Sequence, residues 1–166
     1  MNKYNVDLTR LMVKPLYFGL LMNIFVPVLI LGLAYYLDRS GQSFSEMTLS
    51  ELNIFFWALI IVSVADIAAG YYFMRKRFFA PMIRSKETFE DDLAKGIFTN
   101  SIICFSFSMA IAIYGLVFYF LGGKFMELLF FVFLSFISFQ LVRPRLGFME
   151  KVLVAQEKHV EEGRFL

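Results

Sequence analysis

The sequence has few residues that could hold a metal, a haem or a disulfide. Its 166 residues include one cysteine, Cys104, and one histidine, His159. A single cysteine excludes a disulfide within the chain and any CxxC metal or haem-attachment motif, and a single histidine excludes bis-histidine haem ligation. Cys104 lies in an apolar run and His159 in a charged segment, which favours a small buried hydrophobe and a surface histidine. We therefore predict no metal site and no cofactor.

Charged residues are also scarce. They make up 18% of the chain and apolar residues 59%, with a net charge of +2, whereas soluble domains have about 25% and 45–50%. So small a charge does not indicate nucleic-acid binding. The sequence lacks the G-x-x-x-x-G-K-[ST], G-x-G-x-x-G, G-x-S-x-G and H-E-x-x-H motifs of common catalytic sites. We therefore predict that the protein is not an enzyme.

The apolar residues gather in four long runs: 16–37, 52–74, 97–121 and 125–142. As helices the runs would be about 33, 34, 37 and 27 Å long, close to the roughly 30 Å of a bilayer's hydrocarbon core. They do not alternate in polarity, so they are not barrel strands. The first run is too long for a cleaved signal peptide. We predict an all-α integral membrane protein, residues 1–166 forming one domain of four transmembrane helices in two hairpins.

The basic residues predict the orientation of these helices. Of the 16 Lys and Arg residues, three precede the first run, six lie between the second and third, and five follow the fourth. Only Arg39 and Lys124 fall in the two remaining connections. By the positive-inside rule, both termini and the middle connection are cytoplasmic. We expect a multi-pass protein of the inner, cytoplasmic membrane.

Two segments on the predicted cytoplasmic side carry apolar residues among charges, at 78–95 and 148–162. We predict an amphipathic helix in each, lying on the membrane surface or against a partner. The order of hairpin, basic group and amphipathic segment occurs twice, which leaves an ancient duplication open. The cluster of Arg75, Lys76 and Arg77 either attracts anionic lipid or only anchors the second span.

Asp66 is the one ionisable residue deep inside a predicted span. A charged side chain at this depth costs about 2.5–3.5 kcal/mol on insertion scales, so Asp66 is expected to face protein or water. Ser63 and Gly70 share its helical face, and Ala65 and Ala69 form a small-xxx-small pair beside it. Two interpretations stay open: Asp66 moves a proton or meets a partner subunit, or it stays protonated and holds helices together.

Other polar residues are predicted at a similar depth, about 10–14 Å from the cytoplasmic ends of their spans. They are Asn23, Ser106 and Ser135. Pro27 has no N–H, so the carbonyl of Asn23 loses its usual helical donor. With Asp66 and Ser63, these residues form the candidate ion, proton or interhelical site.

The function favoured by these features is that of a non-catalytic accessory or assembly subunit of a larger membrane complex. Four spans with a basic middle connection are similar in layout to ATP synthase subunit I, a small accessory membrane protein. The resemblance is one of topology and implies no site residue. The alternative is an oligomeric ion- or proton-coupled transporter or channel that uses Asp66. The expected partners are the lipid bilayer and either other membrane subunits or further copies of the chain.

Overall fold

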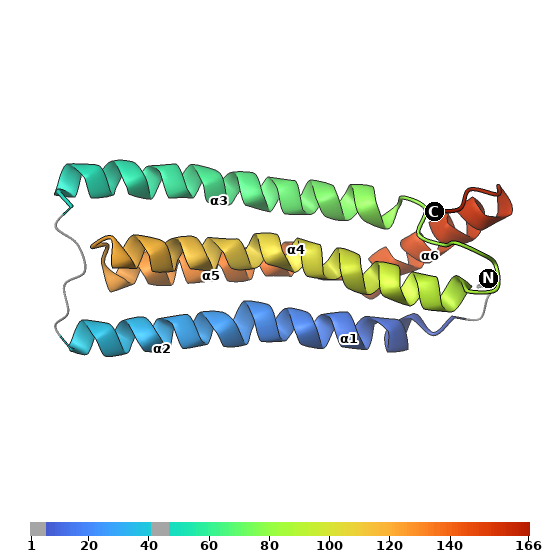
Figure 1. Ribbon diagram of the computed structural model, residues 1–166, viewed down its shortest axis with the longest axis horizontal. Coiled ribbons are helices and arrows are strands. Elements are labelled where there is room, and N and C mark those ends of the chain that lie inside the picture. The colour runs from blue at the N-terminus through green and yellow to red at the C-terminus, as the bar shows by residue number, and fades with distance from the viewer. Residues whose placement is uncertain (1–5, 41–46) are drawn as a thin grey trace.

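The fold was described from a computed structural model, which places residues 6–40 and 47–166. Lys3, which contributes to the predicted charge asymmetry, and residues 41–46 lie outside the described residues. The described part of the chain is helical and contains no strand. Four of its helical stretches are long and apolar enough to cross a membrane, which confirms the prediction of a helical multi-pass membrane protein. They form an elongated bundle (Figure 1).

The first span is one continuous helical stretch with a widened turn in its middle. It consists of α1 (Leu8–Leu20), the π-helical turn η1 (Leu21–Phe25) and α2 (Val26–Arg39). Asp7 caps its start, because its Oδ1 accepts the backbone N–H groups of Thr9 at 3.0 Å and Arg10 at 3.2 Å. Pro27 lies two residues after the widened turn. A proline lacks the N–H that would close a regular helical turn, which explains the irregularity at this point.

The other three spans are regular helices with clear ends. They are α3 (Leu49–Phe78), α4 (Phe89–Phe120) and α5 (Phe125–Val142). Thr48 and Glu51 form a reciprocal capping box at the start of α3. At the start of α5, Glu127 accepts the backbone N–H of Lys124 at 2.6 Å, which places this charge at the helix end rather than in the apolar run. Gly122 allows the tight turn between α4 and α5 by its φ of 102°.

α4 and α5 form the centre of the bundle. Figure 1 shows α1 and α2 on one side of this pair and α3 on the other. The two later spans therefore pack directly as a hairpin, whereas the two earlier spans are separated by α4 and α5. The connection from α3 to α4, the start of α1 and α6 (Leu146–Glu161) all lie at one end of the bundle, which we call the basic end. The opposite end holds the α4–α5 turn and is called the loop end.

Close contacts hold α4 against α5. A Cβ atom on Gly115 would lie 2.6 Å from Cβ of Phe131, so the backbone of α4 approaches α5 more closely than any other residue type allows. The hydroxyls of Ser108 and Ser138 are 2.9 Å apart, and both side chains are buried. A small residue and a polar pair thus join the helices where no hydrophobic effect drives them together.

α6 packs against the end of α3 and the residues that follow it. Gln156, which is fully buried, accepts the N–H of Met82 at 2.9 Å and donates to the carbonyls of Phe78 at 3.2 Å and Ala80 at 2.8 Å. His159 Nε2 lies 3.0 Å from the carbonyl oxygen of Phe79 and donates to it. His159 is therefore a half-buried contact residue, and its interpretation as a solvated surface histidine is wrong.

The predicted amphipathic helix over 78–95 needs correction. Residues 79–88 form turns and bends, and residues 89–95 are the first turns of α4. Pro81 lacks a donor, and polar side chains bind the local backbone: Asp92 Oδ2 accepts the Arg84 N–H at 2.9 Å, and Ser85 Oγ accepts the Thr88 N–H at 3.3 Å. Such bonds compete with a helix. The predicted segment 148–162 does coincide with α6, within two residues at its start and one at its end.

Replacement of Gly115 by leucine should destabilise the bundle. The added side chain would overlap Phe131, and overpacking of this kind costs about 1–3 kcal/mol. Gly32 is the matched control, because a Cβ atom there meets nothing within 4 Å. Gly32→Leu should be neutral or stabilise by up to about 1 kcal/mol, the gain in helix propensity over glycine. Unfolding by SDS in mixed micelles measures both, and an equal loss for the two variants would contradict this packing.

Candidate intramembrane site around Asp66

Asp66 has one side-chain partner among the described residues. The hydroxyl of Tyr114 on α4 donates a hydrogen bond to Asp66 Oδ2 on α3, with 2.7 Å between the oxygens. Both side chains are partly buried. The pair links two helices well inside their apolar stretches, where water offers no alternative partner.

The antiparallel packing of α3 and α4 explains why these two residues meet. Side chains on a helix lean toward its N-terminus. The N-terminus of α3 is at the loop end and that of α4 at the basic end. Asp66 therefore leans toward the loop end and Tyr114 toward the basic end, so their polar atoms approach each other. Backbone depth alone does not predict the contact with Tyr114. The lean of the two side chains, together with a hydroxyl inside an apolar helix, is the signal that could have identified it.

Asp66 and Tyr114 line a pocket of about 440 Å³ on the side of the bundle. Ser106 lies in the same pocket, so the structure brings together two of the residues predicted to share a site. The Ser106 hydroxyl is used within its own helix, where it donates to the carbonyl of Ile102 at 3.0 Å. Ser63 is buried on α3 and donates likewise to Leu59, at 2.7 Å. Asp66 is the one carboxylic acid among the residues that line this pocket.

The structure does not bring Asn23 and Asp66 together. Asn23 lies in η1, on the other side of α4 and α5 from α3 (Figure 1). Its Nδ2 donates to the carbonyl of Gly19 at 3.2 Å. Ser135 is buried on α5, and its hydroxyl has no hydrogen-bond partner. The five predicted residues are therefore distributed over three places: the Asp66 pocket, the interior of the bundle and η1.

The basic cluster at the end of α3 has a regular local structure. Arg75, Lys76 and Arg77 are exposed, and the charged group of each lies 5.2–5.8 Å from the centre of the aromatic ring four residues earlier. Arg75 Nη2 also donates to the hydroxyl of Tyr71 at 2.8 Å. Cations stacked on aromatic rings suit the boundary between hydrocarbon and water, since Lys, Arg and Tyr side chains have an apolar body and a polar end.

Neither metal chemistry nor a relative adds to this site. Within residues 6–40 and 47–166, no group of three or more His, Cys, Asp or Glu side chains could hold a metal ion. Comparison of the chain with protein-family models, with curated proteins and with solved structures found no match.

A double-mutant cycle should detect the Asp66–Tyr114 bond. We expect Asp66→Leu and Tyr114→Phe to be non-additive in the free energy of unfolding, with a coupling near the roughly 0.6 kcal/mol average for intramembrane hydrogen bonds. Tyr119→Phe is the matched control: its hydroxyl donates to Ala34 on α2 at 3.0 Å and not to Asp66. Its effect should add to that of Asp66→Leu. Additive effects of Tyr114→Phe would show that the bond does not form in the membrane.

Proposed function

We propose that the protein is a non-catalytic accessory or assembly subunit of a larger membrane complex, which it contacts through the face of α3 that carries Asp66. One observation carries this proposal: the carboxyl group of Asp66 lies deep in the apolar part of the bundle, in a pocket that opens on the side of the bundle. Asp66 is only partly buried and lines an open pocket. A partner helix that covers this pocket would remove the carboxyl group from lipid.

The energetic argument favours a partner over exposure to lipid. An aspartate at the centre of a span costs about 2.5–3.5 kcal/mol on insertion scales. The one hydrogen bond from Tyr114 offsets about 0.6 kcal/mol of this cost on average. A basic or hydrogen-bonding side chain on another polypeptide would offset more. The interaction would serve assembly.

The surface around Asp66 suits a second helix. In the most apolar part of α3 only 6% of residues are buried, against 44% in α4, so α3 is the span with most free surface. Ala65 and Ala69 are exposed on the side of α3 next to Asp66. Small residues let another helix backbone approach closely, and close approach provides the contacts that hold helices together in lipid.

The proposed location is the inner membrane, with both termini and the connection from α3 to α4 in the cytoplasm. The start of α1, the α3–α4 connection and α6 lie at the same end of the bundle. All the described basic residues except Arg39 and Lys124 belong to these segments or to the helix ends and connections next to them. The positive-inside rule therefore supports placing this end in the cytoplasm.

The alternative is an oligomeric ion- or proton-coupled transporter, favoured by the presence of Asp66 and Ser106 in one open pocket. In a symmetric oligomer the pockets of two copies would face each other. A particle that contains only this chain would support the transporter, whereas a particle with other polypeptides would support the accessory subunit.

Substitutions on α3 should test the proposed docking face. Ala69→Phe places a large side chain beside Asp66, whereas the exposed Ala68 lies on another face of α3 and Ala68→Phe is the control. After gentle extraction from native membranes, the Ala69→Phe protein should be recovered with its partners at least about fivefold less than wild type, since steric overlap costs about 1–3 kcal/mol. Ala68→Phe should behave like wild type. Equal recovery of both variants would refute docking through this face.

Labelling of single cysteines should test the orientation. The native Cys104 is buried, so it should give little background. Ser40 and Lys158 are exposed at the loop end and the basic end. On intact cells, a membrane-impermeant maleimide should label Ser40→Cys and not Lys158→Cys, and after permeabilisation it should label both. The reverse pattern would place the basic end outside the cell.

A further inference from the structure

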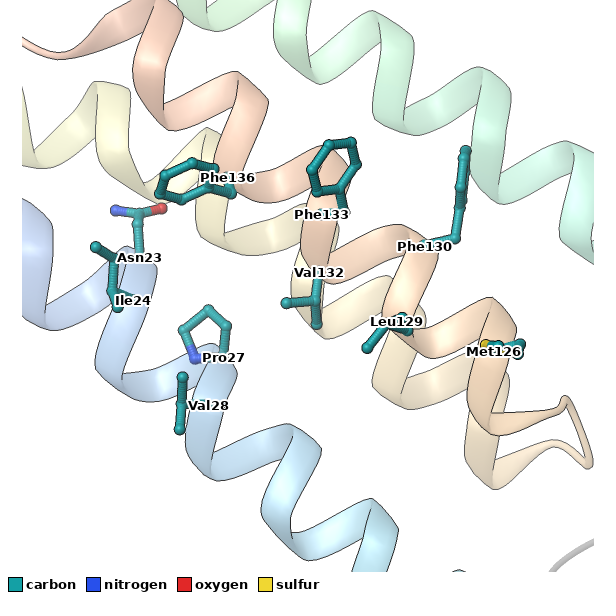
Figure 2. Close-up of a pocket in the computed structure, with 10 residues that line it drawn as sticks. All are labelled: Asn23, Ile24, Pro27, Val28, Met126, Leu129, Phe130, Val132, Phe133 and Phe136. Atoms are coloured by element: carbon teal, nitrogen blue, oxygen red, sulfur yellow. The ribbon is translucent and has the colours of Figure 1, made fainter.

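A second pocket lies between the first span and α5. Its volume is about 560 Å³, within the range of about 300–1,000 Å³ that is usual for small-molecule sites. Four of its lining residues belong to η1 and α2, and six belong to α5 (Figure 2). The lining is aromatic and aliphatic except for Asn23.

The side-chain oxygen of Asn23 is a buried acceptor without a donor. Asn23 is 2% exposed, and its Oδ1 has no hydrogen-bond partner. The orientation of the amide is fixed, because the Gly19 carbonyl at 3.2 Å can only accept and so requires the Nδ2 group. Figure 2 shows the amide beside Phe136 with its oxygen on the side of α5. A buried acceptor without a donor costs about 1–3 kcal/mol, a penalty that a bound donor would remove.

The backbone at this place is also irregular. Asn23 and Ile24 lie in the π-helical turn, and Pro27 and Val28 follow on α2. π-helical turns inside α-helices occur frequently at functional sites. The widened turn and the proline lie where the pocket opens between the helices (Figure 2). The feature that disturbs the helix therefore also forms the wall of the pocket.

We propose that this pocket binds a neutral, lipid-soluble molecule that carries one hydroxyl group. The hydroxyl would donate to Asn23 Oδ1 after a small movement of the Phe136 ring, and the apolar body would lie along Leu129 and Phe133 of α5. A phospholipid fits less well. Asn23 is seven residues from the start of its apolar run, about 10 Å deep, where a charged headgroup would lose its hydration.

The recessed position of the acceptor favours a small molecule over a partner helix. Oδ1 lies below the surface beside Phe136, where a slender terminal hydroxyl would reach it once the Phe136 ring has moved. A helix has no free backbone donor in its middle, and its Ser and Thr hydroxyls are commonly bound to their own helix. This site is independent of the proposed docking of α3, because the two surfaces lie on opposite sides of α4 and α5 (Figure 1).

Photolabelling with a matched pair of probes tests the proposal. The full chain in phosphatidylcholine vesicles is exposed to a hexadecanol that carries a diazirine in its alkyl chain, or to the methyl ether of the same compound, which cannot donate. We expect the alcohol to label peptides from residues 21–39 and 125–142 several-fold more than the ether does. Asn23→Leu should abolish this difference. Equal labelling by alcohol and ether in the wild-type protein would overturn the proposal.

A second variant keeps the test decisive if Asn23→Leu does not fold. Val28 lines the pocket and is 57% exposed, so Val28→Phe should fill the pocket without disturbing the interior and should reduce labelling by the alcohol several-fold. Val64 on α3 has the same exposure and is the control; Val64→Phe should leave labelling unchanged. Labelling that is insensitive to Val28→Phe would overturn the proposal. A photoreactive residue in place of Val28 that captures another polypeptide in native membranes would also overturn it and assign the pocket to a partner helix.

Discussion

The contact between α4 and α5 is the interaction on which the rest of the bundle depends. Lipid tails are as apolar as leucine side chains, so helices in a membrane are held together by close packing and hydrogen bonds. Gly115 provides the close packing against Phe131, and the Ser108–Ser138 pair provides a buried hydrogen bond. The first span and α3 then pack on opposite sides of this central hairpin and leave much of their own surface free.

This arrangement separates the two polar residues that the sequence places deep in the first two spans. Asp66 reaches a donor on α4, and its pocket opens to the side of the bundle. Asn23 donates within its own helix, and its acceptor oxygen has no partner. The first geometry suits a polypeptide that approaches α3 with a donor or a cation. The second suits a small hydroxyl compound that enters between two helices. Both surfaces can be occupied at once, because α4 and α5 lie between them.

Hydropathy predicted the spans well and their ends less well. α5 begins and ends at the predicted residues, because Glu127 caps its start and charged residues follow Val142 directly. α1 and α4 each begin eight residues before their apolar runs. A helix continues past the hydrocarbon wherever its backbone bonds remain favourable, and an apolar run does not record this. The prediction of a separate helix over 78–95 was wrong for a related reason. The apolar residues of this segment face the protein, but Pro81 and the hydrogen bonds to Asp92 and Ser85 prevent a separate helix.

The candidate site was harder to predict because it depends on which spans are neighbours. Depth along each span correctly placed Asp66 near Ser106, since α3 and α4 are in contact. The same measure also paired Asp66 with Asn23, although the two lie on opposite sides of α4 and α5. Depth gives the position of a residue along the bundle axis. Which residues meet also depends on how the helices are arranged around that axis, and depth does not give this. Tyr114 was missed because its backbone lies at a different depth from that of Asp66. The opposite lean of the two side chains brings the hydroxyl to the carboxyl group all the same.

The contacts of α6 restrict where the protein can act. Gln156 and His159 donate to three successive carbonyls at the end of α3 and just after it. The ring of Phe148 packs against that of Phe79, with 5.7 Å between the ring centres. The buried residues of α6 are therefore used within the chain and are not available to recruit a partner. Within the apolar length of the bundle, two chemically distinct surfaces remain free: the Asp66 face of α3 and the pocket at Asn23. A function carried by these surfaces is carried out inside the membrane.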